Sequence, residues 1–90
     1  MTEPRKVTRE EFDEAVEAVW TELQYQDTLP YRTQDEAKDV PGFLTLGRRY
    51  ERLAEDAWAD NEGNEVSLPF LRKLAGIYVR AMIYNGVRKR

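Results

Sequence analysis

The chain has 90 residues, of which 41% are hydrophobic and 34% charged, and its formal net charge is −3. This length fits one domain spanning residues 1–90, and the negative charge offers no basic field for direct DNA binding. Cysteine and histidine are both absent, which excludes disulfides and thiolate metal sites and removes the commonest general base and metal ligand.

The first predicted helix covers Arg9 to Gln26. Thr8 and Glu11 have the spacing of a capping box, in which each side chain accepts a hydrogen bond from a backbone N–H of the other residue. Apolar residues then recur at intervals of three and four, which predicts an inward face. They are Phe12, Ala15, Val16, Val19, Trp20 and Leu23. Trp20 is therefore expected to anchor the core.

A shorter helical turn is predicted between the first two long helices. Thr33 and Glu36 repeat the capping-box spacing, so a single turn from Gln34 to Lys38 is expected. The Val40-Pro41 step should end this turn, because the residue before a proline is disfavoured in the helical region.

The second predicted helix starts at Pro41, which suits a first turn, and runs to about Asn61. Its apolar stripe consists of Phe43, Leu46, Tyr50, Leu53, Ala57 and Trp58. Trp58 is the second expected core anchor. Gly42 and Gly47 each cost about 1 kcal/mol of helix propensity relative to alanine. Close helix packing is the favoured explanation for them, and a ligand touching the backbone is the alternative.

The third predicted helix covers residues 67–85. Ser67 is positioned to cap its start, and Asn85-Gly86 is a typical left-handed stop. Apolar residues occur on almost every side of this segment, which is typical of a buried helix. Its charged residues argue against a membrane span, since each would cost ~2.5–3.5 kcal/mol at mid-membrane. They are Arg72, Lys73 and Arg80.

Together these elements predict an all-α fold, a three-helix bundle or array with a short extra helical turn between helices one and two. Two amphipathic helices cannot cover every side of the third. We therefore expect part of the helix 67–85 to meet another copy of the chain, which gives a homo-oligomer.

Basic side chains provide the candidate binding site. Lys73, Arg80 and Tyr84 fall on one stripe of the third helix by their spacing. The second helix adds Arg48, Arg49 and Arg52. Arginine suits phosphate, and tyrosine can stack on a base, so a nucleotide-like ligand is one interpretation. The other is an internal ion pair between Arg80 and an acid of the second helix, such as Glu51 or Glu55.

Catalysis has little support in the sequence. Ser67 is the only serine, and no histidine can activate it, so a serine or cysteine hydrolase is excluded. The alternative is a magnesium-dependent nucleotide pyrophosphohydrolase of the all-helical MazG-like kind. Glu10, Glu11 and Glu14 match the EExxE spacing of that family, but no acid follows Leu68 to supply its ExxD group. No catalytic residue, metal ligand or cofactor is assigned.

Residues 41–90 contain the runs PGFLTLGRRYERLAEDAWADNEG and LPFLRKLAGIYVRAMIYNGVRKR. Together they resemble small uncharacterised all-helical proteins of tailed phages and prophages, in which a helix ending in AEDAW precedes an LRK-(I/L)-A helix. The resemblance implies a non-enzymatic protein that acts by binding in the host cytoplasm. It would sequester a phosphate-bearing, nucleotide-like signal of host defence or inhibit a host protein, a counter-defence role. The N-terminus shows no apolar run typical of a signal peptide.

Overall fold

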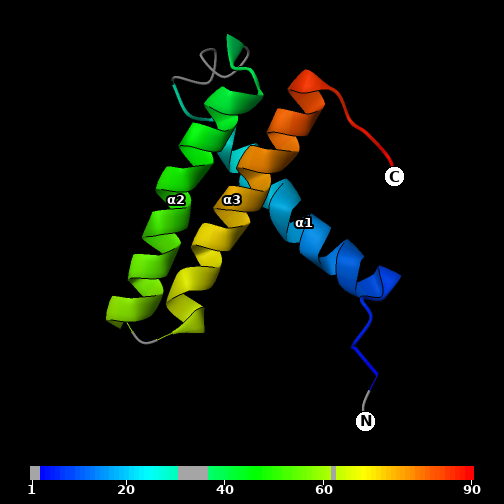
Figure 1. The fold of residues 1–90 in the computed structure, drawn as a ribbon, viewed down its shortest axis with the longest axis vertical. Helices are drawn as coiled ribbons and strands as arrows, with labels where there is room; N and C mark the ends of the chain where they lie inside the picture. The colour runs from blue at the N-terminus through cyan, green and yellow to red at the C-terminus, as the bar shows by residue number, and fades with distance from the viewer. Residues whose placement is uncertain (1–2, 31–36, 62) are drawn as a thin grey trace.

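A computed structural model describes residues 3–30, 37–61 and 63–90. It contains three helices, α1 (Arg9–Gln26), α2 (Val40–Asn61) and α3 (Asn64–Asn85). Helices α2 and α3 lie side by side as an antiparallel hairpin, and α1 crosses α3 near its middle (Figure 1). The predicted all-α fold of three helices is confirmed. The extra turn predicted between α1 and α2 falls largely on residues 31–36, outside the described residues.

The first two helices begin where local hydrogen bonds satisfy their free backbone donors. Thr8 Oγ1 accepts a hydrogen bond from the N–H of Glu11 at 3.1 Å, and the Glu11 carboxylate accepts one from the N–H of Thr8 at 2.9 Å. This is the predicted capping box. At the start of α2, the Asp39 carboxylate accepts a hydrogen bond from the N–H of Gly42 at 3.1 Å, the usual role of a residue just before a helix.

Helix α3 begins three residues earlier than predicted. Gly63 precedes it with φ of 111°, a backbone conformation that favours glycine. The predicted role of Ser67 as a cap is therefore wrong. Its hydroxyl instead donates a hydrogen bond to the carbonyl of Ala54 in α2, at 2.8 Å. The predicted stop at Gly86 is correct, with φ of 114° and its N–H bonded to Met82 O at 2.8 Å.

The core is small and lies mainly between α2 and α3. Its buried apolar side chains are Phe43 and Ala54 from α2 and Leu74 and Ile77 from α3. Phe43 is almost completely enclosed, and its ring centroid lies 6.3 Å from that of Tyr84. Only the part of α3 that faces its two neighbours is buried. The prediction of a helix buried on all sides is therefore wrong for the single chain.

Neither tryptophan anchors this core. Trp20 is 53% exposed and Trp58 is 56% exposed, so the predicted role of both is wrong. Trp20 lies two positions before the buried Glu22 and next to Val19, which is half-buried beside α3, so Trp20 is exposed because it lies on a side of α1 that α3 does not cover. Trp58 lies near the end of α2, where its indole N–H donates to Asn64 Oδ1 at 3.1 Å. Amphipathic spacing identified the apolar stripes, but it does not show which part of a stripe a neighbouring helix covers.

Gly47 allows α2 and α3 to approach closely. An ideal Cβ at this position would lie 2.7 Å from Cζ of Tyr78 in α3, closer than real Cβ contacts. Of the two explanations for a glycine at position 47, close packing is the one that this contact supports.

Replacing Gly47 with alanine is expected to lower the free energy of unfolding by ~1–3 kcal/mol, because the Tyr78 ring must move. Gly42→Ala is the matched control. Its Cβ would meet the flexible Lys38 side chain at 3.3 Å, so we expect no loss of stability and a gain of up to about 1 kcal/mol from the higher helix propensity of alanine. Chemical denaturation of both variants measures the difference. Equal stability of the two variants would contradict this account of the α2–α3 contact.

Within the described residues, no helix carries an apolar stretch long enough to traverse a lipid bilayer.

Candidate functional site

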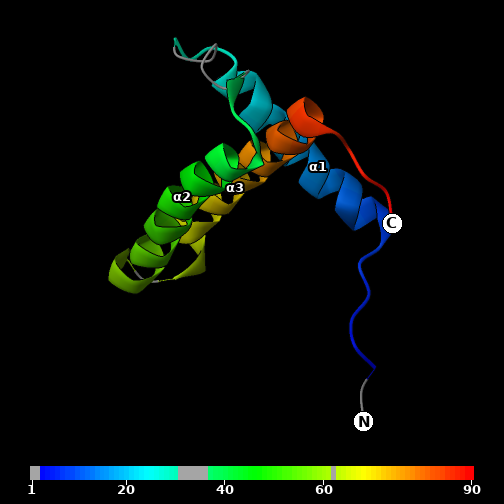
Figure 2. The same cartoon turned by 45° about the horizontal axis from the view of Figure 1, so that its top comes forward.

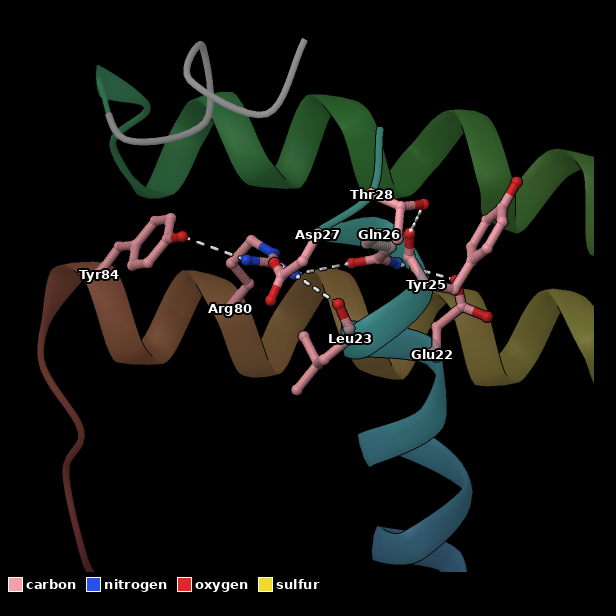
Figure 3. Close-up of polar contacts among 8 residues, drawn as sticks. All are labelled: Glu22, Leu23, Tyr25, Gln26, Asp27, Thr28, Arg80 and Tyr84. Atoms are coloured by element: carbon pink, nitrogen blue, oxygen red, sulfur yellow. Dashed lines mark hydrogen bonds and ion pairs between the residues drawn. The ribbon is translucent and has the colours of Figure 1, made fainter. Parts of the chain in front are cut away.

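Arg80 is the centre of a buried polar cluster where the end of α1 meets α3 (Figure 3). Its side chain is 7% exposed, and Nη2 lies 3.0 Å from the Asp27 carboxylate. The same nitrogen is 3.4 Å from the carbonyl of Leu23 and 3.5 Å from the Oε1 of Gln26. On its other side, Nη1 donates to the hydroxyl of Tyr84 at 3.1 Å. The guanidinium group thus joins α1 to α3.

The internal ion pair considered for Arg80 is present, but its predicted partners are wrong. Asp27 at the end of α1 pairs with Arg80, in place of Glu51 or Glu55 of α2. The reason is geometric: Arg80 lies on the side of α3 that faces the end of α1, and Glu51 and Glu55 belong to α2. The C-terminal end of a helix also carries partial negative charge on its unsatisfied carbonyls. A cation at that end, contacting the carbonyl of Leu23, is therefore doubly favoured.

A second buried polar contact lies on the same α1–α3 interface. Glu22 is 3% exposed, and its carboxylate accepts hydrogen bonds from Nε of Arg72 at 3.0 Å and from Nε2 of Gln26 at 3.1 Å. Sequence reasoning missed this contact. Glu22 does follow Ala15 and Val19 at helical spacing. An acidic residue on the predicted inward face could have indicated a buried ion pair.

Gly76 allows the end of α1 to lie directly on α3. A Cβ at this position would meet Cγ of Glu22 at 3.0 Å and Nε2 of Gln26 at 3.1 Å. The glycine therefore brings the backbone of α3 close to the polar side chains of α1. Together with Arg72 and Arg80, it defines where along α3 the crossing occurs.

Of the other predicted binding residues, Tyr84 contacts Arg80, whereas Lys73 and the three arginines of α2 lie elsewhere. Lys73 faces α2, with Nζ 5.2 Å from the ring centroid of Tyr50. Three exposed arginines of α2 line a separate shallow depression of 340 Å³ together with Leu53. They are Arg48, Arg49 and Arg52. The six predicted residues are therefore divided among three places, with Arg80 and Tyr84 in contact with each other at one of them.

Acidic side chains do not gather into a metal site in the part of the chain that is described. Among residues 3–30, 37–61 and 63–90, no group of three or more carboxylates is placed to hold a metal ion. Glu10, Glu11 and Glu14, the residues that match the EExxE spacing, lie on the first turns of α1. Glu11 is engaged in the capping box there.

Two apolar grooves flank Leu71 of α3. The α2–α3 groove has a volume of 460 Å³ and combines small side chains with Trp58 and two glutamates. It is lined by Glu51, Ala54, Glu55, Trp58, Ser67 and Leu74, among others. The α1–α3 groove has a volume of 560 Å³. It is lined by Ala15, Ala18, Val19, Leu68 and Ala75, among others, with Glu65 and Arg72 as its charged residues.

Comparison of the chain with protein-family models, with curated proteins and with solved structures found no match. The interpretation of the two grooves and of the Arg80 cluster therefore depends on their own chemistry.

Proposed function

We propose that this protein acts by binding another polypeptide, and that the α2–α3 groove receives an amphipathic segment carrying lysine or arginine. The observation that carries this proposal is the combination of an apolar groove with two carboxylates and an exposed tryptophan. Glu51 and Glu55 are one helical turn apart on the α2 side, and Trp58 follows them along the same groove. Tryptophan is among the residues most enriched at binding hot spots.

The chemistry of the groove selects the kind of segment. Leu71 and Leu74 offer apolar contact, and Ala54 and Ser67 leave room for an incoming side chain. The glutamates favour a cation at the edge and disfavour a second acid, which would face like charges. A basic amphipathic helix meets both requirements. Inhibition of a host protein, the role implied by the resemblance to phage proteins, would use such a contact.

A nucleotide-like ligand has less support as a partner. Arg80 already contacts a carboxylate, a carbonyl and a hydroxyl inside the protein. Lys73 lies against Tyr50, and the arginines of α2 occupy a different surface. The cations that would have to converge on phosphate are therefore divided among three places. A MazG-like hydrolase would additionally need a group of carboxylates, which the described residues do not form.

Trp58 provides a direct reporter for a test. In a Trp20→Phe background it is the only tryptophan, so its emission follows the groove alone. We expect a helical peptide of leucine and lysine to shift this emission to the blue. A peptide of the same apolar pattern with glutamate in place of lysine should have little effect. The shift should weaken as salt rises, because exposed charges are screened beyond ~8–10 Å.

Matched charge variants complete the test. Glu51→Gln with Glu55→Gln should weaken binding of the leucine-lysine peptide several-fold, since an exposed ion pair contributes ~0.2–1 kcal/mol. Glu10→Gln with Glu14→Gln removes the same charges, at the same spacing, from α1 and should leave affinity unchanged. Equal binding of the basic and acidic peptides would contradict the proposal. A response to nucleoside triphosphates but to neither peptide would favour the phosphate ligand instead.

A further inference from the structure

The first half of α1 projects away from the rest of the molecule. It leaves the α2–α3 hairpin beyond the crossing point, as both views show (Figures 1 and 2). From residue 9 to residue 20 every side chain is exposed except Glu11 and Val19, which are half-buried. Phe12, Val16 and Trp20 are among the exposed ones. This half of α1 therefore presents an apolar stripe that the single chain leaves uncovered.

Such a segment is poorly stabilised on its own. Isolated helices shorter than ~12–15 residues are marginal in water, and most helical stability in proteins comes from packing an amphipathic face. The capping box of Thr8 and Glu11 supports only the first turn. The exposed half of α1 consequently needs a surface to pack against.

The α1–α3 groove lies at the base of this projecting half. Ala15 and Ala18 form its α1 side, and Ala75 contributes another small side chain from α3. Leu68 and Leu71 stand beside these alanines, and both are exposed. The two exposed leucines thus lie next to a hollow lined by alanines, which leucine side chains of a second copy could fill.

The whole chain also exposes more surface than a compact protein of its size. Its accessible area is 7686 Å², against about 5,500 Å² expected for a folded monomer of this mass. Its radius of gyration is 14.9 Å, against about 12 Å for a compact domain of this length. The extended terminal segments, 3–8 and 86–90, account for part of the difference. A standard interface buries about 800 Å² per partner, which is well within the excess.

We propose that a second copy of this chain fills the α1–α3 groove, so that α1 and α3 of one copy pack against α1 and α3 of the other about a two-fold axis. A two-fold contact uses the same patch on both copies, so the patch must be complementary to itself. Leucines beside alanines satisfy this requirement in shape. Glu65 and Arg72 satisfy it in charge, because opposite signs on one groove can pair across the axis.

Light scattering over micromolar to submillimolar concentration tests the proposal. The parent chain should show twice its mass of 10.6 kDa. Ala18→Arg should reduce the mass to that of the monomer, since a long charged side chain would occupy the groove. Ala59→Arg is the matched control, because the same change at an exposed alanine of the α2–α3 groove should preserve the dimer. Leu68→Gln should act as Ala18→Arg does.

Hydrogen exchange supplies an independent measurement. In the dimer, the amides of residues 12–20 should exchange slowly, and in Ala18→Arg they should exchange at least tenfold faster while α2 and α3 remain protected. The proposal fails if the parent is monomeric at every concentration. It fails equally if Ala59→Arg dissociates the dimer as Ala18→Arg does, or if Ala18→Arg leaves it intact. The peptide assay of the α2–α3 groove is unaffected by either outcome.

Discussion

Replacing Phe43 with alanine is expected to lower the free energy of unfolding by ~3–5 kcal/mol, the usual cost of truncating an enclosed phenylalanine. Phe43 is 1% exposed and contributes the largest fully buried side chain among the described residues. Its ring contacts Tyr84 of α3, so the cavity would open between the two helices that contain most of the core. Small domains are stable by only about 5–15 kcal/mol. Much of the population should therefore unfold in mild denaturant.

Trp20→Ala provides the contrast, because it removes a larger side chain from an exposed site. We expect a change near ~0.5 kcal/mol, as for other surface substitutions. Denaturant titrations followed by circular dichroism, at one protein concentration, compare the two variants. A Trp20→Ala variant as unstable as Phe43→Ala would mean that Trp20 is buried in solution, as it would be if the second copy proposed above covered the stripe of Phe12, Val16 and Trp20.

Replacing Arg72 with methionine is expected to lower the free energy of unfolding by about 3 kcal/mol. The change removes the cation that pairs with Glu22 and leaves a buried carboxylate that still accepts the hydrogen bond from Nε2 of Gln26. Breaking a buried ion pair by deleting one partner typically costs ~3–5 kcal/mol. Arg72 is 46% exposed, so water can partly replace it, which places the expected cost at the lower end of that range.

The second partner tests this explanation. Glu22→Gln combined with Arg72→Met removes the buried charge along with its cation, so the double variant should recover most of the lost stability. Glu22→Gln alone should cost only about 1 kcal/mol, because the half-exposed Arg72 can be hydrated. If the double variant is as unstable as Arg72→Met, the loss comes from packing of the arginine chain instead of from the unpaired carboxylate.

Local rules accounted for most of the helix boundaries. The capping box at Thr8 and Glu11 and the glycine stop at Gly86 involve residues within a few positions of each other, so sequence alone identified them. The start of α3 was predicted three residues too late, because Gly63 was assigned to the end of α2 and is in fact also the residue directly before α3. Gly63 has a positive φ where the chain turns into α3, and the serine that resembled a cap instead donates a hydrogen bond from α3 to the carbonyl of Ala54 in α2.

The candidate sites depended on which helix faces which. Spacing placed Lys73, Arg80 and Tyr84 on one stripe of α3. A stripe wide enough to hold three long side chains contacts both neighbouring helices, α1 and α2. Lys73 therefore lies against Tyr50 of α2, and Arg80 lies against the end of α1. No pattern in the sequence indicates that the partner of Arg80 is Asp27, which is 53 positions away in the chain and 56% exposed.

The sequence by itself determined that the protein is helical, where the helices lie to within three residues, and which side chains are apolar on each. These properties follow from hydrogen bonds and side-chain spacing within a single turn or two. Only the tertiary structure decided that α1 crosses α3 through its last turns, at Gly76. That crossing depends on the close contact of Gly76 with Glu22. It also depends on the ion pairs that Arg72 and Arg80 of α3 form with residues of the last turns and end of α1. It buries Arg80 and leaves Trp20 exposed, because α3 covers only the side of α1 that carries Val19, Glu22 and Gln26.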